Sequence, residues 1–250
     1  GKDVVIMEKV SKAFGTKALF QDIDLAVYFR ERAAIVGQNG TGKSTLLKIL
    51  LGELDVDSGL VKLGSNAKVG YLSQHIKASN PKQTLIEAFR EDISITLEQA
   101  RHVLAKFLFY GPAVFKKVGN LSGGEKMRLR LAQLMHQDIN LLILDEPTNH
   151  LDIDSREVLE EALEEFDGTI LAVSHDRYFL NKYFEKTCWL EDGELVTFEG
   201  NYQYAREKRE ELESKKVVEL PEITKIEQKK KHLVSEASEK RGYEEFEKQL

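Results

Sequence analysis

The chain has 250 residues and a single cysteine, Cys188, so no disulfide can form within it and a reducing, cytoplasmic compartment is predicted. The net charge of −6 gives no overall case for nucleic-acid binding, and no apolar run approaches the roughly 18 residues that span a bilayer. Membrane insertion is therefore not expected. Because the sequence opens with Gly1 instead of a methionine and enters a strand almost at once, we interpret it as part of a longer protein.

The first part of the chain is predicted to be rich in strands. Strands are expected over 4–14, 23–29 and 33–36, the last of them directly before a glycine-rich loop. A helix is expected to begin at Leu46 and to end at Gly52. A turn at 57–59 and short strands at 60–63 and 69–72 follow, which predicts an antiparallel β layer beside a parallel core.

The middle of the chain changes to a helical pattern. Thr84 and Glu87 have the spacing of a capping box, and the apolar residues that follow share one helix face. Further helices are expected over 96–109 and 124–135, separated by a loop over 110–120. We interpret 74–136 as a helical subdomain inserted into an α/β protein.

The last third of the chain alternates buried strands and helices. Continuous apolar runs at 141–144 and 169–173 are typical of central parallel strands, with a helix over 154–165 between them. A hairpin follows around Asp192-Gly193. From about residue 205 lysine and glutamate dominate, and a helix is expected over 205–216. Residues 217–242 suit a helix and a solvated, partly disordered tail equally well, while 243–250 resemble the start of a helical hairpin.

The glycine-rich loop fits the pattern G-x-x-x-x-G-K-[ST] of a phosphate-binding loop. Its glycines allow backbone N–H groups to point inward, and the following helix N-terminus attracts anions. Lys43 adds a charge for the terminal phosphates, and the Ser44 hydroxyl is placed for Mg²⁺. The strand before the loop and the helix after it argue against a turn that binds nothing. The predicted nucleotide-binding residues in the loop are Gly37, Asn39, Gly40, Gly42, Lys43, Ser44 and Thr45.

Two further motifs carry chemistry. Asp145 and Glu146 follow a buried strand, where active groups of α/β sheets gather. Asp145 is predicted to hold magnesium through water, and Glu146 to act as general base; the alternative is an acidic turn. Ser122 to Glu125 place a serine and two glycines at a helix start, which suits a second anion site. An ordinary Ser122 helix cap is the alternative.

Together these motifs resemble the ATP-binding cassette (ABC) ATPases over roughly residues 3–200. The phosphate loop corresponds to Walker A, residues 142–146 to Walker B and residues 121–125 to the signature sequence. The resemblance implies a P-loop NTPase core with a parallel sheet, an antiparallel β subdomain, a helical signature subdomain and a charged helical C-terminal tail. It divides the chain into a nucleotide-binding domain over 1–204 and a linker or extension over 205–250.

The same resemblance assigns four more residues. Gln74 matches the glutamine that senses Mg²⁺ and the attacking water, so the implied magnesium set is Ser44, Gln74 and Asp145. His175 matches the switch histidine that contacts the γ-phosphate, and Asp152 the D-loop aspartate. Phe14 occupies the place of an aromatic residue stacked on adenine. Without the family, Phe14 could be a core strand residue, and Gln74 and His175 surface polar residues.

In this family each ATP lies between Walker A of one domain and the signature of another. The chain has one copy of each, so the resemblance implies a second nucleotide-binding domain, from the same parent chain or a second copy. ATP and Mg²⁺ are the implied cofactors, and ATP hydrolysis the implied reaction. The residues that would act in trans on the partner's ATP are Ser122, Gly123, Gly124 and Glu125.

Within the family the chain resembles the second domain of ABC-F proteins, which act on ribosomes. This resemblance is carried by residues 107–109, 115–118, 146–152, 174–180 and 200–202. The short stretch between Gln74 and Leu121 leaves no room for the helical arm often found in the first domain. It implies a translation factor or a resistance protein that contacts the ribosome, its rRNA and tRNA through the full-length parent.

Other interpretations remain open for the tail and for the whole protein. Residues 229–232, a lysine run, could contact RNA or be merely solvated. The main alternative function is the ATPase subunit of a membrane transporter, which needs a groove within residues 75–120 for a coupling helix. A clamp that uses ATP only to dimerise is a third, against which the presence of Glu146 argues.

Overall fold

The computed structural model describes residues 2–78 and 80–219, with side chains up to residue 217. Contacts divide the chain into two units, Gly1–Gln203 and Tyr204–Leu250, which are described separately. Helix α7 (Tyr202–Glu219) contains the described part of the second unit and confirms the helix predicted over 205–216. The lysine run at 229–232, the pattern at 243–250 and most of 217–242 lie outside the described residues.

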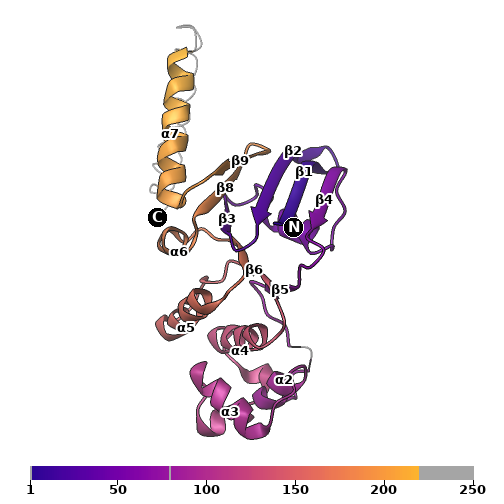
Figure 1. Cartoon of the computed structure of the whole chain (residues 1–250), viewed down its shortest axis with the longest axis vertical. Helices are drawn as coiled ribbons and strands as arrows, with labels where there is room; N and C mark the ends of the chain where they lie inside the picture. The colour runs from indigo at the N-terminus through magenta and orange to yellow at the C-terminus, as the bar shows by residue number, and fades with distance from the viewer. Residues whose placement is uncertain (1, 79, 220–250) are drawn as a thin grey trace, which may run out of the picture. The chain divides into compact units, whose positions relative to one another are not determined.

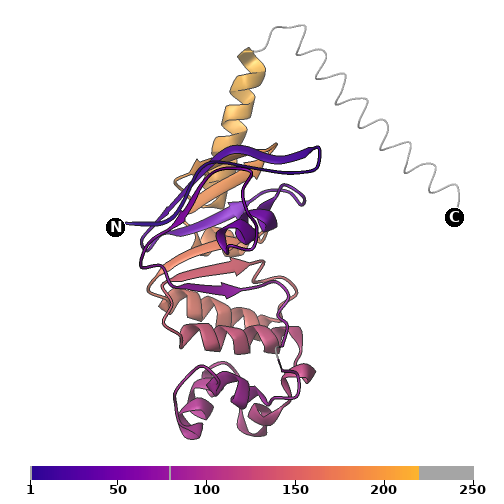
Figure 2. The ribbon, with the colours of Figure 1, turned by 90° about the vertical axis from the view of Figure 1, so that its right-hand side faces the viewer.

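A six-stranded sheet forms the centre of the first unit, and five of its strands run parallel (Figure 2). Across the sheet, the strands are β5 (Val69–Leu72), β6 (Leu141–Asp145), β7 (Thr169–Val173), β3 (Arg32–Val36), β8 (Lys186–Glu191) and β9 (Glu194–Phe198). Only β9 pairs antiparallel, through the hairpin with β8. The uninterrupted apolar runs of β6 and β7 are buried because layers of structure cover both faces of the sheet.

A smaller antiparallel sheet contains β1 (Asp3–Phe14), β2 (Lys17–Tyr28) and β4 (Ser58–Leu63). Strand β2 begins earlier than predicted because Lys17 already pairs with Phe14 across a tight turn. The turn predicted at 57–59 is wrong for Ser58 and Gly59, which begin β4. A Cβ on Gly59 would lie 2.4 Å from the carbonyl oxygen of Lys9, so this glycine permits close approach of two strands.

The helical subdomain contains α2 (Leu85–Arg90), α3 (Leu97–Lys106) and α4 (Gly123–Met135). Each of the three helices begins with a complete capping box, formed at Thr84, Thr96 and Ser122. The predicted loop over 110–120 holds two short 3₁₀ turns, Gly111–Phe115 and Val118–Asn120. Figures 1 and 2 show α4 between the six-stranded sheet and the pair α2 and α3.

The remaining helices are α1 (Lys43–Leu50), α5 (Ile153–Glu165) and α6 (Arg177–Tyr183). Helix α1 starts three residues earlier than predicted, so Lys43 belongs to its first turn. Helix α6 was not predicted, since its seven residues are too short for a clear period. Among the described residues, no helix combines the length and apolar character needed to cross a membrane.

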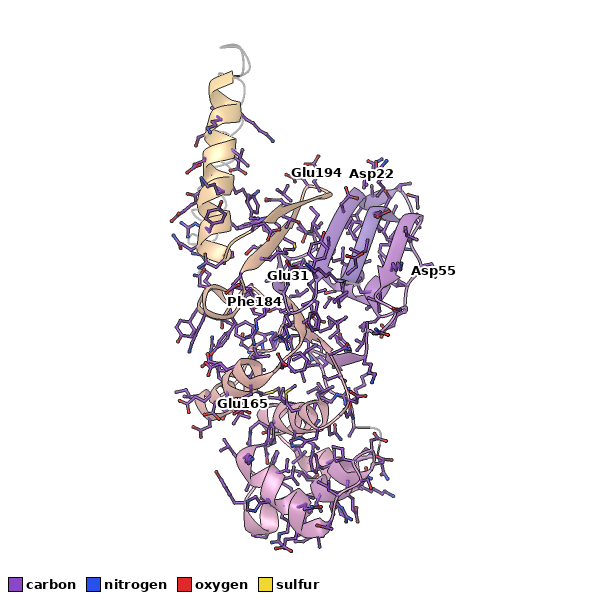
Figure 3. The ribbon with its side chains drawn as sticks, in the orientation of Figure 1. Asp22, Glu31, Asp55, Glu165, Phe184 and Glu194 are labelled. Carbon is purple, nitrogen blue, oxygen red and sulfur yellow. The ribbon has the colours of Figure 1, made fainter. Side chains whose placement is uncertain are left out.

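Two apolar clusters hold the layers of the first unit together. One packs the sheet against α4, α5 and the helical subdomain, and it includes Phe184, labelled in Figure 3. The other fills the space between the six-stranded sheet, α1 and the antiparallel sheet. The predicted α/β architecture, with a parallel sheet, an antiparallel β layer and a helical subdomain, is confirmed.

Candidate functional site

The phosphate loop joins the end of β3 to the start of α1. Gly40 and Gly42 have φ values of +82° and +105°, which L side chains rarely adopt. A Cβ on Gly37 would lie 2.2 Å from the carbonyl oxygen of Leu190, and one on Gly42 would lie 2.8 Å from Leu19. Gly42 is also the N-cap of α1 and offers no side-chain cap, so the first N–H groups of α1 stay available to an anion.

Lys43 lies inside the curl of this loop and is only 7% exposed. Its Nζ donates hydrogen bonds to the carbonyl oxygens of Gly37, at 2.6 Å, and Gln38, at 2.8 Å. Burial lowers the pKa of Lys43, while the negative charges of Glu146 and Asp145 act in the opposite direction. The lysine is therefore aimed into the loop and close to the acidic pair. Ser44 and Asn39 are exposed on the same segment, and Thr45 is half-buried.

Asp145 ends the buried strand β6 and receives a hydrogen bond from a tyrosine that we did not predict. The Tyr71 hydroxyl, from the adjacent strand β5, donates to Asp145 Oδ2 at 3.3 Å. Burial raises the pKa of Asp145, against this hydrogen bond, and the charge of Glu146 raises it further. Burial and the nearby Asp145 raise the pKa of Tyr71 to about 12, so its hydroxyl remains a donor.

Glu146 and His175 meet although they are distant in sequence. Strands β6 and β7 are parallel, and Asp145 pairs with Val173, so the residues that follow each strand emerge at one edge. His175 Nδ1 lies 2.9 Å from Glu146 Oε2, with side-chain exposures of 68% and 13% respectively. Glu146 has a φ of +48°, and its N–H donates to the carbonyl of Val173. This unusual backbone turns the carboxylate toward the histidine.

Gln74 follows β5, next to β6 in the sheet. It lines a cavity of about 310 Å³ together with Gly123, Glu146 and Leu151. The structure thus brings the predicted glutamine, the predicted base and the start of the signature helix to one cavity. Hydroxyl, amide and carboxylate oxygens are the hard donors that Mg²⁺ prefers, so Ser44, Gln74 and Asp145 fit this ion chemically. Within the described residues, no three His, Cys, Asp or Glu side chains cluster as a self-sufficient metal site.

The signature segment forms a helix cap, which agrees with the alternative interpretation of Ser122. Its first residues are also exposed, so a ligand can reach them. Ser122 Oγ accepts from the Glu125 N–H at 3.2 Å, and Glu125 Oε1 accepts from the Ser122 N–H at 3.1 Å. Burial acts to raise the pKa of Glu125, but hydrogen bonds from Lys116 and Ser122 outweigh it and hold this pKa below its usual value. Ser122 and Gly123 are exposed.

The signature helix packs closely against the D-loop. A Cβ on Gly124 would lie 2.6 Å from Asp152 Oδ1, so a larger residue there would displace the Asp152 side chain. Asp152 caps α5 by accepting from the Ser155 N–H at 3.4 Å. The predicted in-trans signature and the D-loop therefore lie side by side on the domain.

Phe14 ends β1 and is 52% exposed, so it is not a core residue. Lys12 Nζ lies 5.4 Å from the centroid of its ring. A cavity of about 860 Å³ borders the phosphate loop at Gly40 and Thr41, and Phe14 is not among its lining residues. Asp22 and Glu194, both labelled in Figure 3, belong to this lining. The predicted stacking role of Phe14 stays a prediction.

Comparison with known proteins identifies the family to which this chain belongs. Residues 20–149, more than half of the chain, match the family described as ABC transporter. The chain belongs to this family. ABC-family membership indicates ATP binding and hydrolysis.

The chain is also similar to ABC proteins from bacteria and plants. It is 36% identical to the ATP-binding protein Uup of Escherichia coli (strain K12), over 97% of the chain and 39% of Uup. It is 38% identical to ABC transporter F family member 2 of Arabidopsis thaliana, over 89% of the chain and 33% of that protein. It is 35% identical to the ribosome protection protein VmlR of Bacillus subtilis (strain 168), over 89% of the chain and 41% of VmlR.

These similarities confirm that the chain resembles a nucleotide-binding domain of the ABC-F branch. The chain spans only about two fifths of the length of Uup and VmlR, and a third of the Arabidopsis protein. Those longer proteins therefore contain further segments besides the one that matches this chain.

Four residues near the site were not predicted: Tyr71, Thr148, Arg156 and Asp176. Asp176 had a readable signal, because an aspartate before a short helix is a good N-cap, and its Oδ1 accepts from the Phe179 N–H. The other three act through contacts with distant segments. No local pattern marks such contacts in a single sequence.

Proposed function

We propose that residues 1–204 form a nucleotide-binding domain that hydrolyses ATP to ADP and phosphate when paired with a second such domain. The observation that carries the proposal is the Glu146–His175 contact of 2.9 Å, at the sheet edge that also presents Lys43. A carboxylate oriented by a histidine, close to a phosphate-binding lysine, is suited to direct water at a terminal phosphate.

Each side chain has a distinct task in this proposal. Lys43 and the loop N–H groups would bind the phosphates, and Ser44, Gln74 and Asp145 would hold Mg²⁺, with Asp145 acting through water. Magnesium supplies positive charge to the phosphate oxygens when bound. Glu146 would polarise the attacking water.

His175 and Gln74 would keep the γ-phosphate in line, and Phe14 would stack on the adenine. Tyr71 would hold Asp145 by the 3.3 Å hydrogen bond described above.

The signature residues would serve a partner's ATP. Ser122 and Gly123 are exposed at the start of α4, and Asp152 is exposed nearby. A helix N-terminus with unpaired N–H groups attracts an anion. The signature segment precedes α4 and the phosphate loop precedes α1, so the two anion-binding segments belong to different helices. The second domain would be another copy or a further part of the same parent chain.

The proposed parent is a cytoplasmic ABC-F protein that acts on the ribosome, as a translation factor or in resistance. Similarity to VmlR, a ribosome protection protein, supports this assignment. Residues 205–250 would then form a charged linker or extension, in which the lysine run at 229–232 would meet RNA phosphates.

Glu146→Gln tests the enzymatic role directly. Since the amide cannot accept a proton, turnover of the paired domains should fall about 10²- to 10⁴-fold while ATP binding persists and the dimer lives longer. Steady-state phosphate release and dimer lifetime measure the two effects. Glu157→Gln, on the exposed face of α5, is the matched control. No turnover in the native pair, together with an unchanged dimer lifetime in Glu146→Gln, would leave the clamp function instead.

One cavity bears on the alternative function as a transporter subunit. A cavity of about 360 Å³ lies between the segment after β5, α2 and α4, partly within residues 75–120. Its lining includes Lys77, Asp92 and Arg130, so it is charged rather than apolar. Sedimentation of the full-length parent with ribosomes in ATP would support the ABC-F role, and recovery with membranes alone would support the transporter subunit.

A further inference from the structure

Asp176 joins three segments of the first unit through one carboxylate. Its Oδ1 accepts from the Phe179 N–H at 3.0 Å and caps α6. Its Oδ2 accepts from Thr148 Oγ1 at 3.1 Å and from Arg156 Nη2 at 2.6 Å. Thr148 lies on the segment after β6 and Arg156 on α5, so the carboxylate links both to the loop after β7.

The carboxylate is built to remain charged in this position. Asp176 and Arg156 are 22% and 29% exposed, so the pair is partly desolvated. Burial acts to raise the pKa of Asp176, but hydrogen bonds from the Phe179 N–H, Arg156 and Thr148 outweigh it and hold this pKa below its usual value. Charge-assisted bonds of this kind are shorter and stronger than neutral ones.

These contacts lie shortly after each member of the proposed catalytic pair in the sequence. Asp176 directly follows His175, and Thr148 lies shortly after Glu146. The His175 side chain is 68% exposed, so packing does little to orient it. The orientation of this imidazole toward Glu146 must therefore come mainly from the backbone that carries it, which Asp176 anchors.

Arg156 connects the same carboxylate to the D-loop. The Arg156 N–H donates to the Asp152 carbonyl at 3.0 Å in the first turn of α5. Arg156 thus connects the helix capped by Asp152 to the loop that holds His175. Its second acidic contact, Nε to Glu160 Oε1, is longer at 3.7 Å.

We propose that Asp176 is a positioning residue: held by Thr148 and Arg156, it keeps His175 Nδ1 against the Glu146 carboxylate and ties this pair to the D-loop helix. This inference rests on the proposed function for its catalytic meaning. The inference that Asp176 orients His175 rests on the contacts described above, and it can be tested without ATP.

The test uses the imidazole of His175 as a reporter. A neutral imidazole whose Nδ1 donates to a carboxylate carries its proton on Nδ1, and long-range ¹H–¹⁵N NMR at about pH 8 reports which nitrogen is protonated. His175→Ala assigns the signal. We expect the Nδ1–H form in the native chain and a loss of this form in Glu146→Ala, which removes the acceptor.

Three variants remove the anchor in different ways. Thr148→Val and Arg156→Gln delete its donors and leave the α6 cap, while Asp176→Asn keeps a good cap but loses the charge. We expect each to shift His175 toward a mixture of tautomers. Lys182→Gln is the matched control, since Lys182 lies on α6 4.0 Å from Glu160, whereas the side-chain donors to Asp176 in the described part of the chain are Thr148 and Arg156. If His175 keeps the Nδ1–H form in all three, or lacks it in the native chain, the proposal is wrong.

A second readout follows hydrolysis in the paired domains. Thr148→Val and Arg156→Gln should lower kcat by up to about 100-fold and leave KM for ATP near its native value, because the pair and not the phosphate loop is disturbed. If the variants shift the His175 tautomer but the native paired domains hydrolyse no ATP, the proposed function is wrong and the positioning role stands. Hydrolysis with an unmoved tautomer, or an equal loss of kcat in Lys182→Gln, would overturn the positioning role alone.

Discussion

The helical subdomain and the catalytic edge of the six-stranded sheet are built in opposite ways. Helices α2, α3 and α4 each begin with a serine or threonine whose side chain binds a backbone N–H three residues later. At the sheet edge, Glu146 meets His175 and Asp145 meets Tyr71, each across a large separation in sequence. Helix starts therefore depend on local chemistry, and the catalytic edge depends on strand packing.

The backbone shows the same difference. Glu146 and His150, on the segment after β6, have φ values of +48° and +56°. Such conformations cost about 1–3 kcal/mol each for residues other than glycine and persist only where surrounding structure enforces them. Each capping box, by contrast, contributes roughly 1 kcal/mol by itself. Substitutions in the two regions should accordingly differ in size.

The largest effect is expected at Gly37. In Gly37→Ala the new Cβ would lie 2.2 Å from the Leu190 carbonyl oxygen, and neither backbone can retreat without distorting the sheet. The free energy of unfolding should fall by about 3 kcal/mol, measured by denaturant titration. Gly123→Ala is the control, since its Cβ would meet nothing within 4 Å and its change should stay within about 0.5 kcal/mol. Equal effects would show that the edge tolerates strain as readily as a helix start.

A smaller effect tests the sheet interior beside this edge. Burial raises the pKa of Cys188 from 9.0 to about 11. Below pH 9 the thiol is neutral in both states, and between pH 9 and 11 mainly the unfolded state loses its proton, so stability falls as pH rises. The native chain should lose about 2–3 kcal/mol over this window in excess of Cys188→Ala. The excess is measured as the difference between the two pH profiles of unfolding free energy, and parallel profiles would contradict it.

The smallest effect is expected in the helical subdomain at Thr96. Thr96→Ala removes the acceptor for the Gln99 N–H, a bond of 3.2 Å, and should lower the unfolding free energy by about 1 kcal/mol. Thr96→Ser, which retains the hydroxyl, should recover most of it. Urea midpoints of the three proteins give the comparison. A loss as large as that of Gly37→Ala would mean that the helix starts also depend on long-range packing.

The amino-acid sequence by itself determined the elements whose signals are local. The phosphate loop, the capping box at Thr84 and the buried runs of β6 and β7 could all be predicted, and a cap at Ser122 was the alternative interpretation of the signature segment. Capping bonds close within four residues, and apolar runs of strand length show burial directly. The family resemblance rested on these motifs and was confirmed by the match over residues 20–149.

Only the tertiary structure decided which distant residues meet. The early start of β2 and the place of Ser58 and Gly59 in β4 were missed because pairing with other strands defines them. Helix α6 was missed for a different reason, since seven residues are too few to show a clear period. The contacts Tyr71–Asp145 and Thr148–Asp176 were missed for the same reason. Strand order and register fix these neighbours, and neither is encoded in the periodicity of one segment, since many partners satisfy the same apolar pattern.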